Sequence, residues 1–112
     1  MVQRSDRLDS AFSALGDPTR RRVLERLGRA EASITDLAES FGMTLTGMKK
    51  HVQVLEQAGL VTTEKIGRTR YCRPGPRRLK EEIDWITRYQ TMLEARYDRL
   101  GEFLERTRGD RS

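Results

Sequence analysis

In the last third of the chain, the apolar residues repeat at a spacing that is typical of a long helix with one apolar face. From Leu79 to Leu104 the repeating positions are separated alternately by four and three residues, which is a heptad seam with one polar position, Gln90. The seam consists of Leu79, Ile83, Ile86, Gln90, Leu93, Tyr97, Leu100 and Leu104. This pattern predicts one helix over residues 77–107.

Four large side chains flank the seam and widen its apolar face: Trp85, Tyr89, Met92 and Phe103. A single helix cannot bury so wide a face on itself. We therefore expect part of this face to pack on its own domain and part to pack on a second subunit.

The length and composition limit what the chain can be. Its 112 residues suffice for one domain and not for two, so residues 1–112 are expected to form a single domain. The apolar share of 36% and the charged share of 35% favour a helical protein with a thin core. The apolar stretches are too short for a membrane-spanning helix, and the first ten residues lack the apolar run of a signal peptide. A cytoplasmic location is the default expectation.

The positive charge is concentrated in the middle of the chain. Residues 43–80 contain nine basic and two acidic side chains, whereas residues 1–42 are neutral overall and residues 81–112 carry a net charge of −2. Such a concentrated field favours a polyanionic partner, above all nucleic acid. A solvated basic surface without a partner accounts for the charge equally well.

Two helices are expected before residue 30. Ser5 is the expected N-cap of the first helix, and Gly16 its end. Its apolar stripe consists of Leu8, Ala11, Phe12 and Leu15. In the second helix, Asp17 is expected to cap the free amides, Pro18 fits the first turn, and Gly28 is the expected end. Its arginines are expected to point into solvent: Arg20, Arg21, Arg22 and Arg26.

A pair of short helices follows, separated by a tight turn. Residues 33–42 predict a third helix with Thr35 as N-cap, and residues 43–59 predict a fourth with Thr44 as N-cap. In the fourth helix, the inner face is expected to hold Met48, Val52 and Leu55. Its outer face is then Thr46, Gly47, Lys49, Lys50 and Gln53.

From Leu60 the hydrophobic period changes to two. Strand-forming residues stand on both sides of Gly67-Arg68, which predicts a β-hairpin over residues 60–73 with a basic tip. Pro74 and Pro76 are expected to end the second strand. The chain thus predicts a mainly α fold with a small β-hairpin, a winged helix-turn-helix with the order α-α-α-α-β-β-α.

This order of elements suits DNA recognition. The fourth helix can present its N-terminal half to the major groove, and the hairpin can reach the adjacent minor groove or backbone. The helix amides near its cap can hold a phosphate. The expected DNA-contacting residues are Thr44, Thr46, Gly47, Lys49, Lys50, Gln53, Lys65, Arg68 and Arg70.

Four segments resemble ArsR-type bacterial transcriptional repressors, and together they cover nearly the whole chain. The segment similar to the family's second helix is residues 14–27, ALGDPTRRRVLERL. The segment similar to its helix-turn-helix is residues 34–61, ITDLAESFGMTLTGMKKHVQVLEQAGLV. KIGRTRYCRP at 65–74 resembles the wing, and residues 84–105 the last helix of a non-metal branch. The resemblance implies a homodimeric repressor of a palindromic operator, often in its own promoter.

On this interpretation the subunits pair through the first and last helices. The expected interface residues are Leu8, Phe12, Ile86, Tyr89, Leu93, Tyr97, Leu100 and Leu104.

Metal-sensing members of the family carry a Cys-x-Cys pair before the Asp-Leu of the third helix, where this chain has Ser33-Ile34-Thr35. A second family site uses histidines on the last helix, and no histidine follows His51. We therefore expect no metal site and no cofactor; a small-molecule effector is left open.

Two single residues have modest expected roles. His51 is expected to be a packing or phosphate-contacting residue rather than a ligand or catalyst. Cys72 is expected to be a small buried hydrophobe, and a redox role would need a depressed thiol pKa, of which nearby Arg70 and Arg73 give only a hint. With one cysteine and one histidine, neither a disulfide framework nor a multi-Cys/His zinc site is possible.

Two further classes of function compete with DNA binding. An enzyme is excluded by inventory, because the chain offers no nucleophile–base pair and no phosphate-binding glycine loop. A protein-interaction module, or an architectural DNA-binding module without operator specificity, stays possible. The polar, basic outer face of the fourth helix argues against protein docking, which favours aromatic and aliphatic residues.

Overall fold

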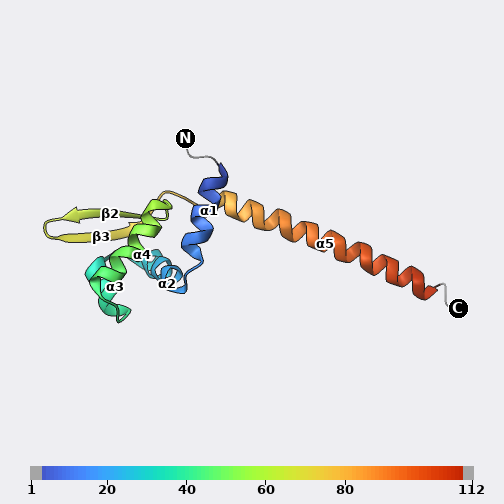
Figure 1. Cartoon of the computed structure of the whole chain (residues 1–112), viewed down its shortest axis with the longest axis horizontal. Helices are drawn as coiled ribbons and strands as arrows, with labels where there is room; N and C mark the ends of the chain where they lie inside the picture. Colours follow the sequence, from blue (N-terminus) through green and yellow to red (C-terminus); the bar gives the residue numbers. More distant parts are fainter. Residues whose placement is uncertain (1–3, 110–112) are drawn as a thin grey trace. The chain divides into compact units, whose positions relative to one another are not determined.

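The computed structural model describes residues 4–109, which form two compact units that meet in sequence between Leu79 and Lys80 (Figure 1). The first unit has the order α1 (Arg4–Leu15), α2 (Pro18–Arg29), β1 (Ala32–Ser33), α3 (Ile34–Ser40), α4 (Leu45–Gln57), β2 (Val61–Ile66) and β3 (Thr69–Pro74). The second unit is the single helix α5 (Lys80–Gly109). The predicted mainly helical winged helix-turn-helix is therefore confirmed.

The sheet has three antiparallel strands, one more than the sequence predicted. β3 lies in the middle of the order β1-β3-β2, and Ala32 pairs with Cys72 on one side while Thr63 pairs with Cys72 on the other. β1 has only two residues, which is too short for any alternation of apolar and polar positions to show. Its Ser33 also caps α3, accepting a hydrogen bond from the Asp36 amide at 3.0 Å.

The core of the first unit is built from all of its elements. Its buried residues are Ala14, Val23, Leu27, Ala32, Ile34, Leu37, Ala38, Met48, Val52, Leu55, Ala58, Leu60, Val61 and Cys72. The inner stripe predicted for the fourth helix is confirmed, because Met48, Val52 and Leu55 are all at most 2% exposed. The predicted N-cap of α4, Thr44, is confirmed, but the helix ends at Gln57 rather than at residue 59. Gly59 follows the Ala58 C-cap at a φ of +78°.

Several predicted helix ends are wrong. Ser5 lies inside α1, which already includes Arg4, and α2 continues past Gly28 to a C-cap at Ala30. Ser33 rather than Thr35 caps α3. Each error moves a boundary by one or two residues, because more than one nearby residue type can serve as a cap.

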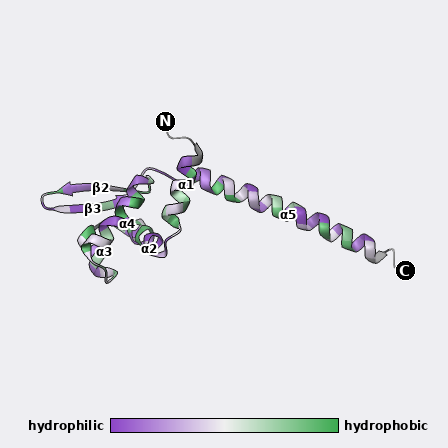
Figure 2. Ribbon diagram, viewed as in Figure 1, coloured by the Kyte–Doolittle hydropathy of each residue, from purple (hydrophilic) through white to green (hydrophobic). Residues whose placement is uncertain are grey.

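The start of the long helix is also later than predicted. α5 begins at Lys80 rather than at residue 77, so the first expected seam residue, Leu79, precedes the helix. Leu79 has a φ of +59° and packs against the core of the first unit. The remaining apolar side chains of α5 are largely uncovered in the single chain: Ile83, Trp85, Ile86, Tyr89, Met92, Tyr97, Leu100, Phe103 and Leu104 are exposed, and Leu93 is half-buried. Figure 2 shows apolar residues recurring along α5.

The α2 arginines do more than cover a solvated face. Arg20 donates hydrogen bonds to the carbonyls of Ser13 and Ala14, and Arg21 donates to that of Leu15, at 2.6 to 3.0 Å. These carbonyls belong to the last turn of α1, which has no further helical amides to bond. Cations are also favourable at a helix C-terminus. The expectation that Arg20 points into solvent is therefore wrong.

Gly75 tests how closely the segment after β3 packs against the Gly59 backbone. It is buried, and a Cβ added there would lie 2.3 Å from the Gly59 carbonyl oxygen. We expect Gly75→Ala to lower the free energy of unfolding by about 2 kcal/mol or more, because backbone rather than a flexible side chain must move. Urea denaturation at a fixed protein concentration measures this change.

Gly28→Ala is the matched control, because a Cβ there meets nothing within 4 Å in a helix. Helix propensity favours alanine, so this variant is expected to gain up to about 1 kcal/mol. Equal stability of the two variants would contradict the packing described at Gly75.

Candidate nucleic-acid interface

α4 separates its apolar and polar residues onto opposite sides. Burial of Met48, Val52 and Leu55 in the core turns the predicted outer face to solvent. Thr46, Lys49, Lys50 and Gln53 are exposed, and Gly47 is half-buried. The structure thus places all five where the sequence predicted.

Thr44 caps the N-terminus of α4. The Thr44 hydroxyl accepts a hydrogen bond from the Gly47 amide at 3.1 Å. A Cβ at position 47 would lie 3.1 Å from the Thr44 hydroxyl oxygen and 3.5 Å from the Met43 methyl carbon. Glycine at this position therefore keeps the cap uncrowded, in addition to leaving room for a close approach of another backbone.

The wing is a tight hairpin in which Ile66 pairs with Thr69 across the two-residue turn Gly67-Arg68. Gly67 has a φ of +64°, which a glycine adopts without strain. Strand alternation places Thr63, Lys65, Arg70 and Cys72 on one face of the hairpin.

α4 and the wing share two adjoining hollows. One, of about 260 Å³, is lined by the cations Lys49, Lys65, Arg68 and Arg70. The other, of about 350 Å³, is lined by Lys49, Gln53, Glu56, Thr63 and Arg70. The structure therefore brings together α4 and wing residues that the sequence had assigned to two separate elements.

Positive charge is held close together at this site. Lys65 and Arg70 are direct cross-strand neighbours, and like charges at such positions are unfavourable without a counter-charge. Among the described residues, Lys49, Lys50, Lys65 and Arg68 form no ion pair. An anion in the hollow would relieve this repulsion.

Arg70 differs from the other cations because it is held inside the wing. Its guanidinium donates a hydrogen bond to the Thr63 hydroxyl at 2.9 Å, and that hydroxyl donates to the Glu56 carboxylate at 2.7 Å. This chain of bonds joins β3, β2 and the last turns of α4. It fixes the wing against the helix, a role that the sequence pattern did not reveal.

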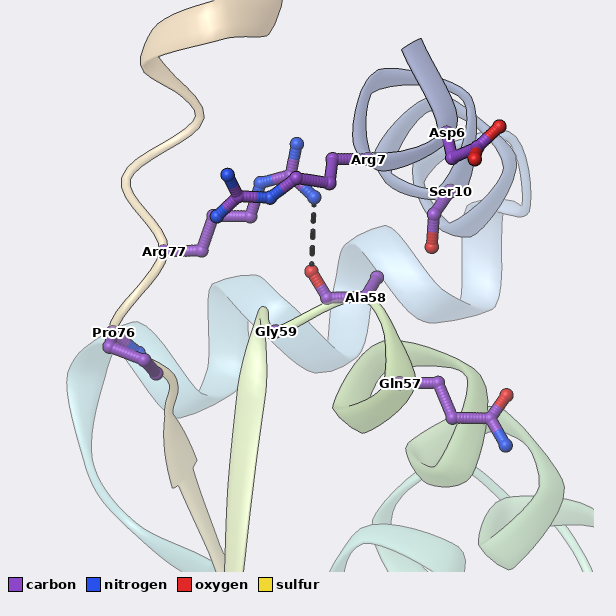
Figure 3. Close-up of a pocket in the computed structure, with 8 residues that line it drawn as sticks. All are labelled: Asp6, Arg7, Ser10, Gln57, Ala58, Gly59, Pro76 and Arg77. Carbon is purple, nitrogen blue, oxygen red and sulfur yellow. Dashed lines mark hydrogen bonds between the residues drawn. The ribbon is translucent and has the colours of Figure 1, made fainter. Parts of the chain in front are cut away.

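The remaining arginines of the basic segment have partners within the fold. Arg73 lies on the other face of the hairpin and pairs with Glu64 at 2.7 Å and Glu31 at 3.9 Å. Arg77 donates to the Ala58 carbonyl at the C-terminal end of α4, beside a hollow of about 590 Å³ (Figure 3). The positive charge available to a partner is therefore concentrated at α4 and the wing tip.

The comparisons with known proteins agree with this arrangement. Residues 15–64 match a family described as a helix-turn-helix domain. An uncharacterized HTH-type transcriptional regulator of Bacillus subtilis, YuzN, is 39% identical over 69 residues, which is 55% of this chain and 75% of that protein. The crystal structure of an ArsR family transcriptional regulator is 38% identical and superposes with a TM-score of 0.74, covering 84% of this chain and 97% of that one. The chain belongs to the ArsR family.

This ArsR-family chain is a DNA-binding transcriptional regulator and not an enzyme. A further relative, the transcriptional repressor SdpR of Bacillus subtilis, is 27% identical over 82 residues, 73% of this chain and 91% of that protein. A homodimeric winged helix-turn-helix domain from Mycobacterium bovis shares the fold, with a TM-score of 0.61 and 24% identity over 83% of this chain and 80% of that one.

Two features are absent from the part of the chain that the structure describes. No group of three or more His, Cys, Asp or Glu side chains within residues 4–109 is arranged to hold a metal ion. In the same range, no helix is both long and apolar enough to cross a membrane.

Cys72 of this ArsR-family chain is a buried residue of the central strand. It is 0% exposed, and burial together with the nearby Glu56 charge raises its pKa to about 11, although Arg70 acts in the opposite direction. The prediction of a small buried hydrophobe is confirmed, and the hint of a depressed pKa is wrong.

The raised pKa makes the Cys72 thiol unreactive. Moving the pKa from 9.0 to about 11 lowers the thiolate fraction at pH 7.5 roughly 100-fold. We expect the folded protein to react with a disulfide reagent such as DTNB at least about 10-fold more slowly than the urea-unfolded protein, because fewer thiols are ionised and the side chain is 0% exposed. Equal rates in the two states would contradict this environment for the thiol.

Proposed function

We propose that this chain is a homodimeric repressor that binds a palindromic DNA operator, in its own promoter, through α4 and the β2–β3 wing. The observation that carries the proposal is the basic hollow that α4 shares with the wing. The apolar residues of α4 lie in the core, whereas Lys49 lines this hollow together with the cations Lys65, Arg68 and Arg70. Gln53 lines the adjoining hollow together with Arg70. A protein-docking surface would instead present aliphatic and aromatic residues along α4. Such a regulator acts in the cytoplasm, where the bacterial chromosome lies.

Each part of this surface has a distinct role in the proposal. Thr44, Thr46 and Gly47 place the amides at the α4 N-terminus against a phosphate. Lys49 and Lys50 contact phosphates or guanine, and Gln53 contacts adenine in the major groove. Lys65 and Arg68 contact the neighbouring backbone or minor groove. Arg70 adds positive charge while it fixes the wing.

Dimerisation accounts for the uncovered face of α5. Its apolar side chains are about half exposed in the single chain, and Trp85 stacks on Tyr89 with ring centroids 5.5 Å apart. A second copy of the chain can cover such a seam. The proposed interface residues are Leu8, Phe12, Ile86, Tyr89, Leu93, Tyr97, Leu100 and Leu104. Dimerisation would place two recognition helices about 34 Å apart, one turn of DNA.

Repression without a transition metal completes the proposal. The relative SdpR carries the name of a repressor, and the ArsR-type segments of this chain support the same direction of control. The chain has no cysteine pair before Asp36-Leu37 and no histidine after His51, so neither metal site of the family can form as it does elsewhere.

Fluorescence anisotropy tests the function directly. The probes are the DNA upstream of the chain's own gene and a scrambled fragment of equal length, each at two salt concentrations. We expect the native fragment to bind roughly 1,000-fold more tightly at near-physiological salt. Equal, steeply salt-dependent binding to both fragments would leave only non-specific affinity for that DNA.

A charge-matched pair of variants tests the α4 contacts. Lys49→Ala with Lys50→Ala is expected to weaken binding and to lower the slope of log affinity against log salt by about 1 to 2, because up to two phosphate contacts are lost. Arg29→Ala with Arg88→Ala removes the same charge from exposed sites elsewhere and should leave the slope nearly unchanged. Equal slopes for both double variants would refute phosphate contact by the lysines.

A second pair of variants tests the dimer. Leu93→Glu places a charge in the proposed seam and is expected to give monomers in light scattering at low micromolar concentration. Thr91→Glu is the control, because two residues along a helix correspond to about 200° around its axis. A persistent Leu93→Glu dimer would show that the seam is not the interface.

A further inference from the structure

His51 lies on the recognition helix α4, and its ring contacts two charged side chains of α2. The ring atom Nδ1 is 3.3 Å from the Asp17 carboxylate oxygen Oδ2 and 3.4 Å from a terminal guanidinium nitrogen of Arg20. All three side chains are largely covered, with exposed fractions of 24% for His51, 26% for Asp17 and 17% for Arg20. We refer to these three residues as the Asp17–Arg20–His51 junction.

The junction joins three helices. Arg20 bonds the last carbonyls of α1 and lies 3.7 Å from the Asp17 carboxylate. Asp17 is the N-cap residue of α2, yet its side chain makes no capping bond to an α2 amide, contrary to the role that the sequence predicted. His51 adds the middle of α4 to this arrangement. The carboxylate is therefore turned away from its own helix and toward α4.

The chemistry of Nδ1 allows it to serve only one of its two neighbours at a time. A guanidinium only donates hydrogen bonds, so a bond from Arg20 needs a lone pair on Nδ1. A carboxylate only accepts, so a bond to Asp17 needs a proton on Nδ1. In the structure Asp17 Oδ2 is buried and receives no hydrogen bond. Protonation of the ring would supply the missing donor.

We propose that His51 is a positioning residue for DNA binding: its ring fixes the rotation of α4 against the start of α2, and it does not contact DNA. This inference rests on the proposed use of α4 as the recognition helix. Lys50 and Gly47 stand one and four residues from His51 on the same helix. Any rotation of α4 that breaks the junction therefore also moves the proposed DNA-contacting residues.

The protonation state of the His51 ring should then change the affinity for DNA through its contact with Asp17. Among residues 4–109, the charged side chains in contact with the His51 ring are Asp17, the N-cap residue of α2, and Arg20 of α2. On its own helix, the positions three and four residues away are uncharged: Gly47, Met48, Val54 and Leu55. α1 contributes the Ser13 and Ala14 carbonyls, which Arg20 bonds. A protonated ring gains a bond to the buried carboxylate oxygen, so protonation of His51 tightens the junction.

Substitutions at His51 separate positioning from contact. An asparagine amide can both donate to Asp17 and accept from Arg20, whereas leucine can do neither. At pH 7.5 we expect His51→Leu to weaken binding to the upstream DNA fragment roughly 5- to 10-fold, and His51→Asn to restore most of that loss. An equal loss in both variants would overturn the positioning role.

The pH profile distinguishes the junction from a direct phosphate contact. We expect the wild-type affinity to rise between pH 8 and pH 5.5, and Asp17→Asn to remove most of this rise although His51 is retained. If the rise is unchanged in Asp17→Asn, His51 acts on the DNA directly and the proposal is wrong.

A DNA-independent measurement keeps this test separate from the operator proposal. A double-mutant cycle of Asp17→Asn and His51→Leu in urea denaturation is expected to show a coupling free energy that is larger at pH 5.5 than at pH 8. Because His51 is the one histidine of the sequence, nitrogen NMR of the tag-free protein reports its ring alone. In the neutral ring the proton should reside on Nε2, leaving Nδ1 for Arg20.

The operator proposal and the junction proposal can be refuted independently of each other. If no DNA fragment is bound specifically, the operator proposal fails while the cycle still reports on the junction. Zero coupling between Asp17 and His51 at both pH values would overturn the junction even if the wild-type protein binds its operator.

Discussion

The arrangement of the proposed DNA-binding surface depends on the burial of one side of α4. Met48, Val52 and Leu55 are almost wholly inside the core, where they contact the other elements of the first unit. Burial of side chains of this size contributes roughly 1.5–3 kcal/mol each, which makes the rotation of α4 about its axis costly to change. The exposed side of the helix is therefore fixed as the polar one. The Asp17–Arg20–His51 junction adds a directional contact at the edge of this packing.

The position of the wing follows from strand register and from one chain of hydrogen bonds. Because β3 is paired on both sides, Cys72 is held in the centre of the sheet, and Lys65 and Arg70 are placed on the face that lines the hollows. The Arg70–Thr63–Glu56 bonds then join that face to α4. A register shift of one residue in either strand would turn that strand's cation, Lys65 or Arg70, to the opposite face.

The second unit has the opposite character, because α5 has large apolar side chains that stay about half exposed in one chain. Their heptad spacing was readable directly, since a 4-3 repeat sustained over several turns is typical of a long helix with one apolar seam. The exact start of the helix could not be predicted from the spacing, because Leu79 fits the repeat in sequence but takes a positive φ before the helix begins. The periodicity of side chains therefore indicated the helix and its apolar face, whereas local backbone geometry determined its boundary.

The sequence by itself determined the order of the main elements, the inner stripe of α4, its Thr44 cap and the two-residue turn of the wing. Each of these depends on residues within a few positions of one another, where periodicity, caps and turn chemistry act. Tertiary structure alone decided that two-residue β1 joins the sheet, that Arg70 is held by Thr63, and that Asp17 turns from its own helix toward His51. In these cases the partner lies in another element, and the polar group takes the partner that folding brings near it rather than the nearest one in sequence.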